Sequence, residues 1–89
     1  MPRRERWSIL ADVLRAIREL SQGDPAQAKI SNLALRAGLP HDRLLLYVED
    51  LAKADLVTRD RMPRLTERGR LVLEHYDALR DVMGRFGLE

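Results

Sequence analysis

Apolar side chains recur every three or four positions along three stretches of the chain, and this spacing predicts three amphipathic α-helices. The first is expected over residues 5–20, the second over residues 41–54, and the third from residue 67 to about residue 83. The inner faces of the first two comprise Trp7, Leu10, Val13, Leu14, Ile17 and Leu20, and Leu44, Val48, Leu51 and Ala52. These faces predict one shared hydrophobic core.

A shorter helix is expected over residues 31–37, directly before the second long one. Ser31 is predicted to cap its start, because a serine hydroxyl accepts hydrogen bonds from the unpaired amides of the first turn. Gly38 is expected to end it, and Pro40 has a φ suited to the start of the next helix. Two helices joined by a glycine-containing turn form a helix-turn-helix, whose second helix lies in the major groove of DNA.

After this motif the pattern becomes that of a β-ribbon. Residues 56–59 are β-prone, residues 60–63 have turn composition, and residues 64–66 suit a short returning strand. A polar loop over residues 21–27 precedes a minimal third strand expected at residues 28–30. The predicted fold class is mainly α with a small β-ribbon. It consists of a winged helix-turn-helix core over residues 1–66 and a C-terminal helix over residues 67–89, in a single domain.

Composition narrows the possible functions. Eighty-nine residues, 45% of them hydrophobic, bury one core and leave little room for a deep substrate cleft. The chain has no cysteine, and its two histidines, His41 and His75, are far apart in sequence. No nucleophile or acid–base pair stands out, so we expect no catalysis, metal or cofactor. No apolar run approaches the ~20 residues that cross a bilayer, so a soluble, cytoplasmic protein without a membrane partner is expected.

The net charge is only +2, but the cations are unevenly placed. Residues 56–70 carry two acidic groups and five arginines: Arg59, Arg61, Arg64, Arg68 and Arg70. A guanidinium group suits phosphate because its planar fork donates two parallel hydrogen bonds. Arginine-rich surfaces also arise from coding bias or thermal adaptation, but this clustering on a wing favours DNA phosphates. A second, smaller group of arginines lies near the N-terminus: Arg3, Arg4 and Arg6.

The predicted recognition helix has a mixed outward face: His41, Asp42, Arg43, Leu46, Tyr47, Glu49 and Asp50. Arg43 is expected to read guanine or to bind a phosphate, and His41 and Tyr47 to donate to backbone oxygens. The carboxylates on this face would be repelled by phosphates. A single stripe cannot bury three consecutive leucines equally, so Leu45 or Leu46 is expected to contact a second subunit or a protein partner.

The C-terminal helix carries apolar residues at alternating spacings of four and three: Val72, Tyr76, Leu79, Met83 and Phe86. This coiled-coil-like seam is about two heptads long, too short to be stable alone in water. We expect it to form a homodimer interface together with Trp7, because two-fold pairing is the commonest way for a small module to cover such a seam. The alternative is that the seam packs on Trp7 and Val13 of the same chain.

Four short motifs resemble those of the small winged-helix transcriptional regulators common in archaea: Ile30-Ser31-Asn32-Leu33-Ala34, Ala37-Gly38-Leu39-Pro40, Tyr47-Val48-Glu49 and Leu65-Thr66-Glu67-Arg68-Gly69. The resemblance implies DNA as the ligand and an antiparallel dimer through the C-terminal helix. It assigns residues 41–54 to the major groove, residues 59–64 to the wing, and Tyr76, Leu79 and Met83 to the dimer. The sequence departs from the family at Asp55, where a glycine usually ends the recognition helix.

These observations predict a homodimeric transcriptional regulator, or a chromatin-like architectural factor, that binds double-stranded DNA. Affinity is expected from the wing arginines Arg59, Arg61 and Arg64, and base reading from His41, Arg43 and Tyr47. The alternative is a protein–protein interaction module without DNA binding, which docks through Leu45, Leu46 and Tyr47. The nearly neutral net charge favours this alternative, whereas the clustered wing arginines favour DNA.

Overall fold

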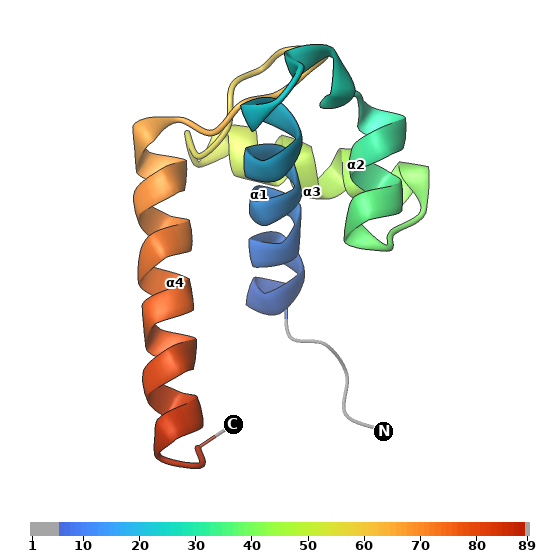
Figure 1. The fold of residues 1–89 in the computed structure, drawn as a ribbon. Helices are drawn as coiled ribbons and strands as arrows, with labels where there is room; N and C mark the ends of the chain where they lie inside the picture. The colour runs from blue at the N-terminus through green and yellow to red at the C-terminus, as the bar shows by residue number, and fades with distance from the viewer. Residues whose placement is uncertain (1–5, 89) are drawn as a thin grey trace.

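A computed structural model describes residues 6–88, which form four α-helices and one short 3-10 turn (Figure 1). The helices are α1 (Arg6–Gln22), α2 (Ile30–Ala37), α3 (His41–Lys53) and α4 (Glu67–Arg85), and the 3-10 turn η1 covers Pro25–Gln27. The four helices predicted from sequence are confirmed, with boundaries that move by one or two residues. The predicted start of the first helix at Glu5 and the arginines Arg3 and Arg4 lie outside the described residues.

The hydrophobic core is built around α1, whose buried stripe follows the predicted spacing. Helices α2, α3 and α4 and the segment after α3 all contribute side chains to it. The most deeply buried large side chains are Leu14, Ile17, Leu33, Leu44, Leu51, Leu73, Val13 and Pro63. Trp7 is 52% exposed and lies outside this core, although its position in the stripe predicts burial. The core therefore begins one turn later in α1, at Leu10.

Two predictions about the start of α2 are wrong. The helix begins at Ile30, and Lys29 holds the N-cap position with an extended backbone and no side-chain cap. Ser31 lies inside the first turn, so its hydroxyl does not cap the helix. Because Ile30 packs against the core as part of α2, residues 28–30 do not form the predicted third strand.

The turn between α2 and α3 has the predicted chemistry. Gly38 adopts a left-handed conformation with φ 68°, and its amide donates to the carbonyl of Leu35 over 3.2 Å. Pro40 precedes α3 as its N-cap residue with φ −60°. A residue with a side chain would be strained at the φ of Gly38, so this glycine sets the angle between the two helices of the motif.

The ribbon after α3 is shorter than predicted, and the described residues contain no strand there. Pairing is limited to one antiparallel bridge between Val57 and Leu65. The Thr58 amide donates to the Arg64 carbonyl over 2.9 Å, and the Thr66 amide donates to the Leu56 carbonyl over 3.1 Å. The Arg64 amide donates to the hydroxyl of Thr58 and not to its carbonyl, so the backbone pairing does not continue toward the tip. We call residues 56–66 the wing.

Helix α4 packs against the first residue of the wing through a close backbone contact at Gly69. A Cβ atom at this position would lie 1.9 Å from the carbonyl oxygen of Leu56, so only glycine fits. Thr66 caps the helix as predicted, because its hydroxyl accepts from the Gly69 amide over 3.0 Å. The same hydroxyl donates to the Asp55 carbonyl over 2.6 Å. Leu73 then anchors α4 in the core.

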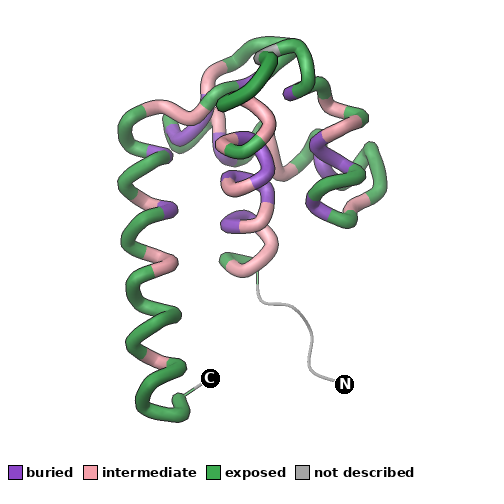
Figure 2. The backbone as a smooth tube through the Cα atoms, in the orientation of Figure 1, coloured by how far each residue is buried: buried purple, intermediate pink, exposed green. Residues whose placement is uncertain are grey.

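The predicted seam on α4 is covered only in its first half. Val72 and Tyr76 pack against the core. The guanidinium group of Arg15 in α1 lies 2.5 Å from the carboxylate of Asp77, and this ion pair links α1 to α4. Beyond this point α4 is mostly exposed (Figure 2), with Leu79 at 58% and Phe86 at 73%. Packing on the same chain therefore accounts for the upper part of the seam and leaves its lower part uncovered.

Candidate nucleic-acid interface

Helix α3 has a buried face, a fully exposed face and a flank that lies beside the start of α1. Leu44 and Leu51 are buried in the core, with Val48 half-buried beside them. Positions three and four apart share a face of a helix. The outermost strip accordingly carries Asp42, Leu46, Glu49 and Lys53, all of them exposed. This strip is not basic, and Glu49 and Lys53 face each other over 3.7 Å.

One flank of α3 brings together the residues that we call the α3 flank cluster: Arg6, Arg43, Leu46, Tyr47 and Asp50. They line a shallow depression between the start of α1 and α3. The Arg6 guanidinium donates to the Asp50 carboxylate over 2.8 Å and lies 5.9 Å from the centre of the Tyr47 ring. Tyr47 is half-buried and packs on the core, so its ring has less free surface than its predicted outward position implies.

His41 lies away from the α3 flank cluster. It lines a separate, mostly apolar depression formed largely by α2 and the turn: Ser31, Ala34, Leu35, Gly38 and Leu39. Its Nδ1 atom is 3.9 Å from the carboxylate of Asp42. The structure thus brings Arg43 and Tyr47 together and separates them from His41, although the sequence suggests one group of three.

The contact between Arg6 and α3 cannot be predicted from the sequence. Arg6 and its partner Asp50 are 44 positions apart, and helical periodicity gives no information about contacts between separate helices. The sequence shows only that Arg6 belongs to a small N-terminal group of arginines. The structure therefore adds the first turn of α1 to the candidate interface.

The wing carries the three arginines singled out from the sequence, Arg59, Arg61 and Arg64, and all three are exposed. Among the described residues none of them forms an ion pair, whereas Arg6, Arg15 and Arg36 each have a carboxylate partner. The backbone amide of Arg64 donates to the hydroxyl of Thr58 over 3.0 Å, which holds the base of the wing together. These three guanidinium groups therefore keep their donors available for an anion.

The wing and the α3 flank cluster lie at opposite ends of α1. Figure 1 shows residues 56–66, drawn in yellow to orange, crossing the end of the molecule where α1 finishes. Arg6 begins α1 at the other end, beside α3. The candidate interface therefore has two cationic parts, with α3 contributing the flank beside Arg6.

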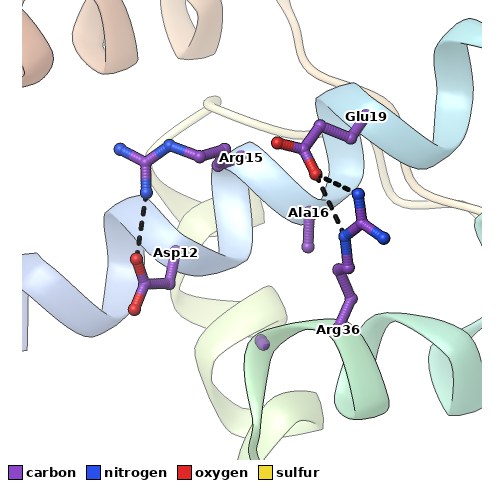
Figure 3. Close-up of a pocket in the computed structure, with 6 residues that line it drawn as sticks. Asp12, Arg15, Ala16, Glu19 and Arg36 are labelled. Carbon is purple, nitrogen blue, oxygen red and sulfur yellow. Dashed lines mark hydrogen bonds and ion pairs between the residues drawn. The ribbon is translucent and has the colours of Figure 1, made fainter.

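A polar depression between α1 and α2 has the opposite character, because its charges pair with one another (Figure 3). Asp12 is 3.0 Å from Arg15, and Glu19 accepts two hydrogen bonds from Arg36 over 2.6 Å and 3.0 Å. These pairs tie α2 and α4 to α1, since Arg15 also reaches Asp77. We interpret these ion pairs as contacts that stabilise the packing of the helices, and not as a binding site.

Residues 6–88 offer no candidate for two other kinds of site. In this part of the chain, no three side chains of the histidine, cysteine, aspartate and glutamate types come together as they would to hold a metal ion. No helix there is both long and apolar enough to cross a membrane.

Comparison with known proteins identifies the family. A family model described as winged helix-turn-helix matches residues 3–84 of the chain. No curated protein matches its sequence. The match spans the helix-turn-helix, the wing and nearly all of α4, and it agrees with the arrangement of helices in the structure. The chain therefore belongs to the winged helix-turn-helix family.

Proposed function

We propose that this protein is a transcriptional regulator that binds double-stranded DNA as a homodimer, through α3 and the arginine-rich wing. The observation that carries this proposal is the set of three exposed wing arginines, which have no carboxylate partner among the described residues. Exposed guanidinium groups without partners bind phosphates readily, since no internal ion pair has to be broken.

On this proposal the two cationic parts have different tasks. The wing arginines neutralise phosphates or enter the minor groove, which gives affinity without sequence preference. Arg43, which has no ion-pair partner among the described residues, contacts a base edge from the flank of α3. His41 and Tyr47 donate to backbone oxygens on either side and fix the orientation of the helix.

The homodimer is supported by the uncovered half of the α4 seam. Leu79, Met83 and Phe86 continue the spacing of Val72 and Tyr76 beyond the part that the same chain covers. A second copy of α4, packed in the antiparallel direction, would cover these side chains and would present two DNA-binding surfaces related by a two-fold axis. Trp7, exposed at the start of α1, is the proposed contribution of α1 to this interface.

The test is fluorescence anisotropy of a labelled mixed-sequence duplex at about 50 mM and about 200 mM salt. Binding through phosphates weakens steeply over this range, because counterions released from DNA become costlier to displace into the solution. We expect micromolar binding at the lower concentration and a loss of about tenfold or more at the higher one. Absence of binding at the lower concentration would refute the proposal.

A second candidate function is supported by the outermost strip of α3. Leu46 is 64% exposed between Asp42 and Glu49, and Leu45 is 42% exposed beside it, a composition suited to a protein partner. On this candidate, α3 docks a larger assembly and the wing arginines remain solvated. Leu46→Gln separates the two candidates, because it removes the apolar side chain without adding a charge: it would weaken capture of a protein partner while leaving salt-dependent binding to DNA in place.

A further inference from the structure

The contact between Arg6 and Asp50 suggests how the α3 flank limits its own contacts with DNA phosphates. We propose that Asp50 is a positioning residue, which holds the Arg6 guanidinium away from phosphates and so lowers binding to DNA of any sequence. This inference rests on the proposed function and adds an element that weakens the phosphate contacts of every DNA complex alike. Its basis is one ion pair within a depression that contains two arginines.

The geometry gives Arg6 two partners inside the protein. Its guanidinium donates to the Asp50 carboxylate over 2.8 Å and lies 5.9 Å from the centre of the Tyr47 ring, within the range of cation–π attraction. Both partners lie on the same flank of α3, one helical turn apart. They hold Arg6 against the helix, although its side chain is 62% exposed and within reach of an approaching anion.

Arg43 lines the same depression without a carboxylate partner among the described residues. Of the two guanidinium groups, one is therefore engaged and the other is available. A phosphate that recruited Arg6 would have to displace Asp50, and the carboxylate left behind would then repel it. A base edge read by Arg43 requires no such exchange. The Arg6–Asp50 pair consequently reduces the phosphate contribution of this flank and leaves base contacts unaffected.

The experiment compares the salt dependence of DNA binding for wild type, Asp50→Asn, Arg6→Gln and the double variant. Asn is nearly isosteric with Asp but carries no charge, so Asp50→Asn releases Arg6. Each additional phosphate contact steepens the plot of log affinity against log salt by about 0.9. We expect Asp50→Asn to steepen this slope by about 0.9 and to raise affinity for mixed-sequence duplex about two- to fivefold. The slopes of Arg6→Gln and the double variant should remain at the wild-type value.

Asp81→Asn is the matched control, because it removes the same charge from a carboxylate that also pairs with an arginine, Arg85 over 2.8 Å, but lies on α4, outside α3 and the wing. It should leave the slope unchanged, which separates release of Arg6 from a general change in charge. Discrimination is measured with a preferred duplex, selected from a random pool with wild type, against the mixed-sequence duplex. Both Asp50→Asn and Asp81→Asn should preserve the ratio of the two affinities, because a phosphate contact is available on either duplex.

Two results would overturn the inference while leaving the proposed function in place. One is a wild-type slope in Asp50→Asn. The other is a slope flattened by about 0.9 in Arg6→Gln, because Arg6 would then already bind a phosphate in wild type. If wild type shows no salt-dependent binding, the proposed function and this inference fail together, which is recognisable before any variant is measured.

Discussion

At the scale of single residues, the start of α4 shows that each position of a short sequence motif has its own structural role. Leu65-Thr66-Glu67-Arg68-Gly69 supplies a bridge residue, a cap and a position without a side chain, in that order. Thr66 joins three segments, because its hydroxyl links the Asp55 carbonyl to the Gly69 amide. The cap was predictable from sequence since capping depends on local chemistry. The contact between Gly69 and Leu56 was not, because it depends on how the wing returns.

Asp55 is the other residue whose conformation the sequence left open. It follows α3 with φ 61°, a left-handed conformation that side chains rarely adopt. Aspartate tolerates this region better than most residues, because its short polar side chain interacts with the local backbone. The helix therefore ends without the glycine that the resemblance leads one to expect at this position.

Replacing Gly69 with alanine should destabilise the fold by about 2 kcal/mol or more, because the new Cβ would force the α4 and Leu56 backbones apart. The measurement is the free energy of unfolding in urea. Gly84→Ala is the control, since Gly84 is an exposed position in the same helix. There, alanine should stabilise by about 0.5–1 kcal/mol through helix propensity. Equal effects at the two positions would contradict the close contact.

Replacing Thr66 with valine keeps the shape of the side chain but removes the hydroxyl. The loss of the cap and of the bond to the Asp55 carbonyl should cost about 1–2 kcal/mol of unfolding free energy. Thr66→Ser retains the hydroxyl and should remain within about 0.5 kcal/mol of wild type. The comparison is made by urea denaturation, and a serine variant as unstable as the valine variant would show that the methyl group matters more.

At the scale of elements, hydrophobic periodicity located α1, α3 and α4 because each has one face against the core. The same reasoning failed at residues 28–30, where three residues are too few for a period to be measured. It also predicted two strands in the wing, where only a single bridge forms. For the candidate site, residue type identified the exposed wing arginines, but the grouping of Arg43 with Arg6 and away from His41 required the structure.

The flank of α3 gives a prediction about sequence reading. Arg43→Ala should reduce the ratio of affinities for the preferred and the mixed-sequence duplex by about tenfold or more, since one bidentate contact to guanine contributes about 1–3 kcal/mol. The measurement is competition anisotropy with both duplexes at one salt concentration. A uniform loss on both duplexes would instead identify Arg43 as a phosphate contact.

At the scale of the whole molecule, α4 closes the core and carries the surface proposed to meet a second copy. Its first half closes the core through Leu73, and its second half is exposed. In Figure 1 this second half extends past the beginning of α1, where none of the described helices lies beside it. A single chain is thus folded around its core but leaves an apolar helix end uncovered, which is the physical basis for the proposed dimer.

Leu79→Glu should convert the proposed dimer to a monomer, because a charge would be buried at the centre of the seam. The mass in solution, from sedimentation or light scattering, reports the change. Leu71→Glu is the matched control, since Leu71 is an exposed leucine of the same helix outside the seam. A wild-type protein that is monomeric at ~100 μM, a concentration at which contacts of about 6 kcal/mol would be seen, would remove the dimer from the proposal.

The central claim is that the wing arginines bind phosphates, and the most direct measurement is the salt slope of DNA binding with and without them. Arg59, Arg61 and Arg64 are replaced together by alanine. The control replaces Arg18, Arg80 and Arg85, which lie on α1 and α4, so both variants lose three positive charges. We predict a slope flattened by up to about 2.7 for the wing variant and a wild-type slope for the control. Equal slopes in all three proteins would contradict the account.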